Sequence, residues 1–250
     1  MVTVISPLST EYPLVARACP DLSALDDAVI QCCACPRLVA WREYVAAHPA
    51  PGYTSADYWS KPLPGFGDPH APIMVIGLAP GAHGSNRTGR MFTGDKSGDY
   101  LFGSLHRVGL ASAPVAVSAD DGLRLTSVRL TAPVRCVPPE NKPTALERRR
   151  CGPFLARELE LVKPRVVVVL GGFGWHAVCQ TLAEQGWPMP KPKPKFSHGA
   201  LVELIQAAGG LNITLLGCYH PSPHNTYTGR LTPEMLDAVF TQAKLLAQLA

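Results

Sequence analysis

Short apolar runs alternate with longer amphipathic stretches along this chain. The runs that predict strands, from their length and β-branched content, are 72–79, 127–134, 165–170 and 213–219. The third contains VVVVL, which is apolar at every position and typical of a parallel strand buried on both faces. Residues 199–204 predict a further strand, antiparallel to the last.

Helical periodicity fills the segments between the predicted strands. It predicts helices at 37–48, 97–109, 145–161, 174–185 and 233–248. Ser23 is the expected N-cap of a shorter helix over 24–32, and Thr144 has the capping-box spacing to Glu147. Strands that alternate with helices in this way predict a doubly wound α/β fold.

The composition favours one well-buried domain over residues 1–250, of which residues 1–22 are expected to form an irregular N-terminal arm. The chain has 250 residues, of which 46% are apolar. It lacks a signal-peptide pattern and an apolar run of about 20 residues, so a cytoplasmic protein is expected, with no membrane partner and as a monomer. Eight cysteines are too few for a disulfide scaffold. In a reducing compartment, clustered cysteines favour metal ligands.

Two polar loops follow predicted strands. IMVIGLAPG (73–81) leads into AHGSNRTGRMFTGD (82–95), and ITLLGCYH (213–220) leads into PSPHNTYTGR (221–230). Ligands of open parallel sheets bind beyond the carboxyl ends of the strands, so both loops can face one crevice. Asp95 there offers a base, while His220 and Asn225 offer hydrogen-bond donors. The pattern predicts a pocket for a planar base.

The two loops resemble the active-site motifs of the uracil-DNA glycosylase superfamily, most closely its family 5 (type b). GFGD at 65–68 and RCVPPENKPT at 135–144 fit the same family. The resemblance implies a three-layer α/β/α sandwich with a central, mostly parallel four-stranded sheet. It also implies an enzyme that removes deaminated bases from DNA and carries an iron–sulfur cluster.

Four cysteines are spaced as possible metal ligands. Cys32 and Cys35 form a C-x-x-C pair, and Cys136 and Cys151 follow at a wide spacing. The residues alone leave an iron–sulfur cluster, a zinc ion and unrelated buried thiols equally open. The resemblance implies that these four positions hold a 4Fe–4S cluster. Cys33 makes the register of the first pair ambiguous.

The resemblance also implies roles in binding a base that has been turned out of the DNA stack. Phe92 is expected to stack on the base, although a core aromatic is the alternative. Backbone N–H groups near Gly81 and Ala82 are expected to bind carbonyl oxygens of the base. His83 is expected to line the pocket mouth, with a purely loop-stabilising role equally open. Ser222 and Asn225 are expected to grip phosphates or wedge the duplex.

Cleavage of the glycosidic bond needs a donor to the departing base and stabilisation of the sugar cation. His220 is the expected donor. Asp95 is expected to orient or deprotonate water, and an N-cap role near Ser97 is compatible with that. The resemblance implies that Asn141 assists substrate or water, with a turn residue as the alternative.

A net charge of +4 fits a polyanionic partner but equally a solvated surface. Arg87 and Arg230 are the expected DNA-binding residues. Asp95 interrupts the phosphate-loop spacing in GRMFTGDKSG, which argues against nucleotide hydrolysis.

The chain departs from other branches of the superfamily at Ala79 and Ala132, where those branches have polar side chains. We therefore expect excision of uracil together with hypoxanthine or xanthine. Alternatives are a non-catalytic iron–sulfur protein that binds damaged DNA, an electron carrier and a zinc protein.

Overall fold

The computed structural model describes residues 12–205 and 212–249, and its centre is one mixed sheet. In spatial order the strands are β1 (Phe66–Gly67), β3 (Val128–Thr131), β2 (Ile73–Ile76), β4 (Val166–Leu170), β6 (Asn212–Cys218) and β5 (Leu201–Ile205). The four inner strands are parallel, and the two edge strands pair antiparallel to their neighbours. Every residue of β2, β3 and β4 is buried. The side chains of β2 and β4 are all apolar, whereas Arg129 and Thr131 of β3 are buried through hydrogen bonds to Glu158.

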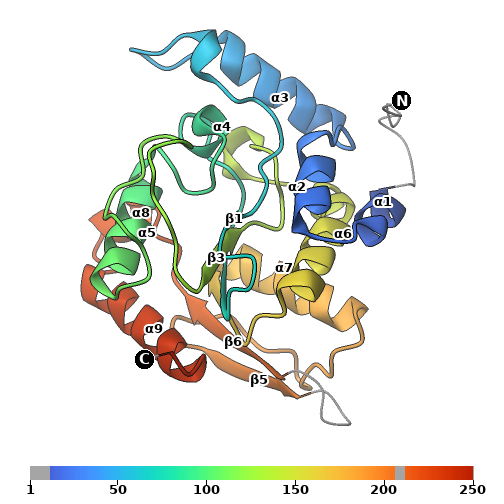
Figure 1. Ribbon diagram of the computed structural model, residues 1–250, viewed down its shortest axis with the longest axis vertical. Helices are drawn as coiled ribbons and strands as arrows, with labels where there is room; N and C mark the ends of the chain where they lie inside the picture. Colours follow the sequence, from blue (N-terminus) through green and yellow to red (C-terminus); the bar gives the residue numbers. More distant parts are fainter. Residues whose placement is uncertain (1–11, 206–211, 250) are drawn as a thin grey trace.

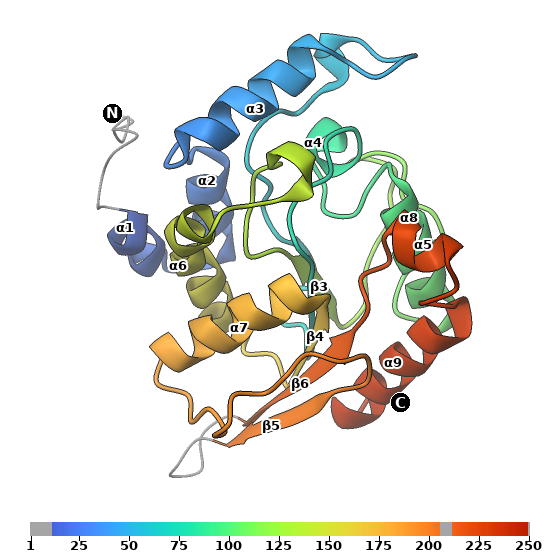
Figure 2. The ribbon, with the colours of Figure 1, turned by 180° about the vertical axis from the view of Figure 1, so that it is seen from behind.

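Helices cover both faces of this sheet and form the outer layers (Figure 1, Figure 2). The helices are α1 (Tyr12–Ala18), α2 (Leu22–Ile30), α3 (Pro36–Ala47), α4 (Ser85–Thr88), α5 (Lys96–Arg107), α6 (Ala145–Val162), α7 (Gly172–Glu184), α8 (Pro223–Tyr227) and α9 (Pro233–Leu246), with short 3-10 turns η1 (Ser55–Asp57) and η2 (Pro139–Asn141). One core lies between the sheet and α5 and α9, where Phe102 and Phe240 are fully buried. The other lies between the sheet and α6 and α7. The predicted three-layer α/β/α class is therefore confirmed.

Local sequence signals explain where several helices begin. Thr144 and Glu147 form the predicted capping box of α6, with reciprocal backbone and side-chain hydrogen bonds. The side chain of Thr232 accepts a hydrogen bond from the backbone N–H of Met235 at the start of α9. These caps hold α6 and α9 in place on opposite faces of the sheet.

The structure differs from the sequence predictions mainly at the edges of the fold. The sheet has six strands rather than four, because β1 and β5 extend it on both sides. β5 confirms the further antiparallel strand predicted at 199–204, whereas β1 was not predicted. The irregular arm predicted over 1–22 is wrong for Tyr12–Ala18, which form α1 and pack against α6. Residues 1–11 lie outside the described part. The N-cap of α2 is Asp21 and not Ser23, since the Asp21 carboxylate accepts from the Ala24 N–H at 2.9 Å.

Candidate active site

A cavity of about 610 Å³ opens at the carboxyl ends of the parallel strands. Its walls come from the segment after β2, the end of β3, η2 and the segment after β6. The volume lies within the usual range of about 300–1,000 Å³ for small-molecule sites. The lining residues predicted from the sequence are Gly81, Ala82, His83, Phe92, Asp95, Asn141, His220 and Ser222. These residues come from segments that are far apart in the sequence, and they meet at one cavity at the carboxyl ends of the strands, as the sequence predicted.

Phe92 forms an apolar wall of the cavity in an unusual backbone conformation. Its φ of 54° is in the left-handed region, which is unfavourable for a bulky side chain and is found where surrounding structure enforces it. A Cβ on Gly77 would lie 2.6 Å from Cζ of Phe92, so glycine at the end of β2 makes room for the ring. The ring of His220 lies 6.3 Å away, centroid to centroid, at a tilt of 32°. Two flat side chains therefore border the cavity.

Asp95 immediately precedes α5, where it caps the helix and also lines the cavity. Its Oδ1 accepts a hydrogen bond from the backbone N–H of Gly98 at 3.0 Å, the N-cap interaction expected as an alternative. Its Oδ2 faces Gly81 and Gly84, where a Cβ would collide with the carboxylate. Burial raises the pKa of Asp95, and hydrogen bonds from the Gly98 and Ser97 N–H groups partly offset this. A carboxylate with a raised pKa in a cavity is suited to accept a proton.

His220 follows β6 and is held in place by the segment behind it. The side-chain amide of Asn225 donates to the carbonyl oxygen of His220 at 2.9 Å. Burial lowers the pKa of His220 to about 4, so the imidazole is neutral at physiological pH. A neutral imidazole retains one N–H donor, which can stabilise developing negative charge without a formal cation.

Asn225, Arg87 and Arg230 lie outside the cavity wall. Asn225 supports His220 instead of facing the ligand space. The Arg87 guanidinium lies 4.1 Å from the ring centroid of Tyr53, and Arg230 lies 4.5 Å from that of Tyr219. Both arginines are therefore held on aromatic faces near the two site loops, and Arg230 is exposed.

Two features of the cavity were not predicted from the sequence. Lys96 and Ser97, at the start of α5, also line it, and the helix-start pattern after Asp95 was the available signal. Tyr58 contacts His83 from a segment 25 residues away, through a hydrogen bond of 2.7 Å. No local sequence pattern predicts this contact between Tyr58 and His83. Ala79 and Ala132, singled out as departures, both line the cavity with short apolar side chains.

Comparison with known proteins agrees with this geometry. The model of the family described as the uracil DNA glycosylase superfamily matches residues 64–244. A type-5 uracil-DNA glycosylase of Thermus thermophilus is 49% identical over 230 residues, covering 92% of this chain and 100% of that protein. The chain belongs to the uracil-DNA glycosylase superfamily. The type-5 uracil-DNA glycosylase of Mycobacterium tuberculosis is 48% identical, covering 93% of this chain and 84% of that protein. That of Pyrobaculum aerophilum is 46% identical, covering 86% of this chain and 88% of that protein. These similarities place the chain with the type-5 members of the superfamily.

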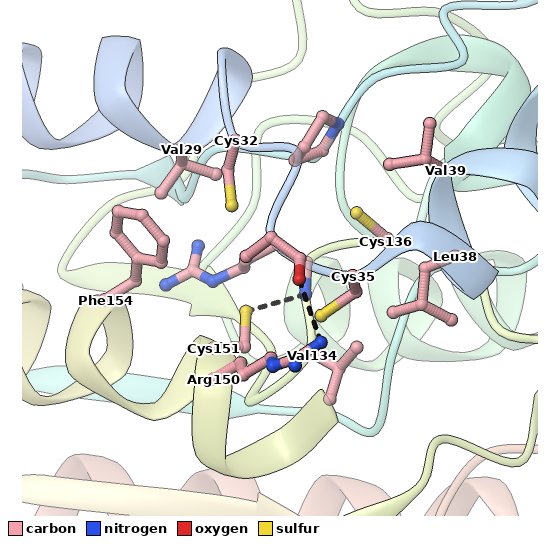
Figure 3. Close-up of a pocket in the computed structure, with 13 residues that line it drawn as sticks. Val29, Cys32, Cys35, Leu38, Val39, Val134, Cys136, Arg150, Cys151 and Phe154 are labelled. Atoms are coloured by element: carbon pink, nitrogen blue, oxygen red, sulfur yellow. Dashed lines mark hydrogen bonds between the residues drawn. The ribbon is translucent and has the colours of Figure 1, made fainter. Parts of the chain in front are cut away.

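The family resemblance drew attention to four cysteines, and these line a second, smaller cavity (Figure 3). Cys32 and Cys35 come from the segment between α2 and α3, Cys136 follows β3, and Cys151 lies in α6. Their sulfurs point into the same space, which Val29, Leu38 and Phe154 close on its apolar side. Three distant parts of the chain thus converge on one set of thiols.

Buried arginines surround these thiols with hydrogen-bond donors. Nη1 of Arg42 donates to Sγ of Cys136 at 3.5 Å, and the backbone N–H of Arg135 donates to Sγ of Cys151 at 3.4 Å. Nε and Nη1 of Arg135 and Nε of Arg42 are buried and lack a partner among the described residues. Buried orphan donors are costly, so they favour an acceptor-rich anionic group in this cavity.

The four thiols offer the donor set of either an iron–sulfur cluster or a tetrahedral zinc ion, and the two groups need different spacings of the sulfurs. In residues 12–205 and 212–249, no three His, Cys, Asp or Glu side chains are grouped as ligands of one metal ion. Zinc needs its sulfurs about 2.3 Å from one point. A 4Fe–4S cluster takes one cysteine at each iron and therefore accepts a wider set. Burial raises the pKa of Cys32 to about 12 and of Cys35 to about 11, so bound cations would have to hold them as thiolates.

A membrane-spanning role finds no support in the helices. Within the described part of the chain, no helix is long and apolar enough to cross a bilayer.

Proposed function

We propose that this protein is a monofunctional DNA glycosylase that hydrolyses the bond between uracil and deoxyribose and leaves an abasic site. The observation that carries the proposal is the shared cavity at the sheet edge, which brings together Phe92, Asp95 and His220. Family membership supplies the substrate class, because the type-5 relatives are named uracil-DNA glycosylases. A base inside the helical stack cannot reach such a cavity, so the nucleotide must be turned out of the duplex first.

Each side chain has a defined part in the proposed reaction. The base stacks on Phe92 and the backbone near Gly81 and Ala82 binds its carbonyl oxygens. As the C1′–N bond breaks, its electron pair passes to the base, and the N–H of neutral His220 donates to a base oxygen. Asp95 stabilises the positive charge that develops on the sugar and takes a proton from the water that attacks C1′.

Asn141 and Ser222 complete the opening of the cavity. Asn141 has a φ of 55°, a left-handed conformation that asparagine tolerates better than most residues. This conformation places it on η2 at the cavity wall, where its amide can bind the substrate or the water. Ser222, which precedes α8, is in reach of a phosphate next to the turned-out nucleotide.

We also infer that the pocket accepts other deaminated bases, including hypoxanthine and xanthine. Ala79 and Ala132 line the cavity with methyl groups, so these positions offer no amide or carboxylate to read the edge of uracil. When a different base enters such a site, no buried polar side chain is left without a hydrogen bond. The site therefore discriminates weakly between bases.

The four cysteine thiolates are proposed to hold a 4Fe–4S cluster. Cys136 and Cys151 bound the loop that carries Asn141, and Cys32 and Cys35 belong to the N-terminal helices. A cluster bound there would supply a structural link between these segments. Through that loop, the cysteine site supports the wall of the base cavity.

Contacts with the DNA backbone are proposed for the cations beside the cavity, of which Lys96 and Arg230 are exposed. Arg87 and Arg230 are held on aromatic rings, and Lys96 extends from the start of α5. Tyr227 on α8 is 76% exposed and lies on the segment that follows His220. Arginine and lysine contacts to phosphates release counterions, so affinity for DNA should fall as salt rises.

A monomeric state and a cytoplasmic location remain predictions.

A panel of duplex and single-stranded oligonucleotides tests the activity. Each carries one uracil, hypoxanthine or xanthine, and abasic product is detected by alkaline strand cleavage under single-turnover conditions with intact holoprotein. We expect product from uracil and slower product from the purines. Retained binding to damaged DNA with no abasic product on any of them would instead support a non-catalytic damage-binding protein.

A further inference from the structure

His83 is bound by a buried tyrosine that no part of the proposed reaction uses. His83 is exposed and lines the mouth of the base cavity. Its Nδ1 lies 2.7 Å from the hydroxyl of Tyr58, and the two rings are nearly perpendicular, at 88°. Tyr58 is 8% exposed and follows η1, in the excursion between α3 and β1. This contact joins that excursion to the site loop after β2.

The hydrogen bonds of Tyr58 favour one tautomer of His83. The backbone N–H of Ala50 donates to the Tyr58 hydroxyl oxygen at 3.1 Å. That amide can only donate, so the hydroxyl proton is available for His83 Nδ1, its other partner. An imidazole that accepts at Nδ1 carries its proton at Nε2 when it is neutral. The contact therefore leaves His83 with a donor, and not an acceptor, at its outer nitrogen.

The same excursion also anchors the main chain of His83. The carbonyl oxygen of His83 accepts a hydrogen bond from Nε of Arg87 at 2.9 Å. The Arg87 guanidinium in turn lies against the ring of Tyr53. Both the backbone and the ring of His83 are consequently positioned before any ligand binds. A pre-positioned donor loses little conformational entropy when it makes its contact.

The position of His83 indicates what it binds. Asp95 and His220 are partly buried in the cavity, whereas His83 is exposed at its mouth. When a base occupies the cavity, the sugar–phosphate backbone must pass this mouth. A phosphate oxygen accepts hydrogen bonds and offers none, so it matches an Nε2–H donor and would be repelled by a bare nitrogen lone pair.

We propose that Tyr58 is a positioning residue that orients His83, whose Nε2–H donates to a phosphate oxygen next to the excised nucleotide. This inference rests on the proposed glycosylase function. It assigns His83 to the grip on the DNA backbone rather than to the chemistry at C1′. Tyr58 acts through His83 and touches no substrate.

Tyr58→Phe tests the inference because it removes the hydroxyl and keeps the buried ring. In single-turnover excision of uracil, we expect the half-saturating enzyme concentration to rise about 3- to 10-fold, the effect of one hydrogen bond. The limiting rate should stay within about twofold, since the chemistry is untouched. Tyr44→Phe, at an exposed tyrosine of α3, is the matched control and should leave both quantities unchanged.

Variants of His83 give a readout that a merely structural role would not produce. His83→Ala should raise the half-saturating concentration at least as much as Tyr58→Phe, and adding Tyr58→Phe to it should cause no further change. His83→Gln, which retains a terminal N–H donor, should recover part of the affinity. A methylphosphonate beside the uracil should weaken wild-type binding and have a smaller effect on His83→Ala.

Specific results would overturn the inference. Additive effects of Tyr58→Phe and His83→Ala, or a loss in limiting rate with unchanged half-saturation, would show that the pair does not act on phosphate binding. Equal thermal melting of the wild type and Tyr58→Phe would confirm that the protein remains folded. If the wild type releases no uracil at all, the proposed function fails, and direct DNA-binding assays of the same variants still test the Tyr58–His83 pair.

Discussion

Oδ1 of Asp95 accepts a hydrogen bond from the backbone N–H of Gly98 at 3.0 Å, while Oδ2 of the same carboxylate lies against Gly81 and Gly84 in the wall of the base cavity. One oxygen caps α5 and so orients the side chain, and the other lies among the residues that line the cavity. Gly81 and Gly84 allow this arrangement, because a Cβ at either position would collide with Oδ2. The cap therefore orients the proposed base.

Asp95→Ala should lower the single-turnover rate of uracil excision by about 10²-fold or more, the scale of a positioned acid–base group. It also removes the N-cap, so we expect a loss of about 1 kcal/mol in stability and a melting temperature about 2–4 °C lower. Asp95→Ser is the matched variant, because serine caps helices well but is a poor base. It should restore the melting temperature and leave the rate low. A normal rate in Asp95→Ser would remove Asp95 from the chemistry.

The pH dependence of the limiting rate should follow the ionisation of Asp95. The pKa of Asp95 is raised by burial, so the rate should begin to fall on acidification at a higher pH than the ordinary aspartate value of about 3.9 suggests. His220, with a pKa of about 4, stays neutral through most of this range. A pH–rate profile of Asp95→Asn should lack this acid limb. Activity that increases as His220 becomes protonated would contradict donation by a neutral imidazole.

Gly77→Ala should weaken binding of the base by displacing the Phe92 ring. The added Cβ would come within 2.6 Å of Phe92 Cζ, so the ring or the strand must move. We expect uracil excision to fall by about tenfold or more, since misplacement near the reacting bond is costly. Gly103→Ala on α5 is the control, because its Cβ would meet the flexible end of Arg107 at 3.3 Å and the carbonyl oxygen of Pro114 at an ordinary contact distance of 3.9 Å. Equal rates for both variants would argue against Phe92 as a fixed wall.

Cys151→Ser should lower the iron and sulfide content of the purified protein and weaken its brown absorbance. Cys151 lines the cavity with the other three thiols, whereas Cys179 lies in α7 outside it. Cys179→Ser should therefore keep the full metal content. Stoichiometric zinc and no iron in the wild type would select the zinc alternative. Full iron content in Cys151→Ser would remove this residue from the ligand set.

The sequence predicted the centre of the fold well because its signals are local. The VVVVL run at 166–170 forms β4 as expected, and the Thr144 capping box begins α6. The edges required tertiary information. β1 has only Phe66 and Gly67, which carry no periodic pattern and become a strand by pairing with Leu130 and Arg129 of β3. At α2, both Asp21 and Ser23 can cap a helix, and the buried Leu25 and Val29 fit the helix from either start.

In the candidate site, too, the features set by local sequence were predictable, whereas the contacts set by tertiary structure were not. The motif loops after β2 and β6 brought Phe92, Asp95 and His220 to one cavity as predicted. Asn225 is expected to bind substrate, and in the structure its amide also donates to the carbonyl oxygen of His220, a contact that the sequence did not predict. Tyr58 could not be identified because its partner lies across a loop whose path depends on packing. Side-chain chemistry predicted which residues matter, whereas the partners of those residues depended on the fold.

Ala132→Asn should convert a broad pocket into one that prefers uracil. Ala132 is 2% exposed, directly follows β3 and lines the cavity, so an amide there would face the edge of a bound base. Uracil could satisfy that amide, whereas a purine would meet extra volume and leave it unpaired, so the ratio of uracil to hypoxanthine excision should rise by about tenfold or more. Ala132→Leu adds similar volume without hydrogen-bonding groups and should slow both substrates. An equal change of the ratio in the two variants would show that volume, and not the missing hydrogen bond, controls which base is removed.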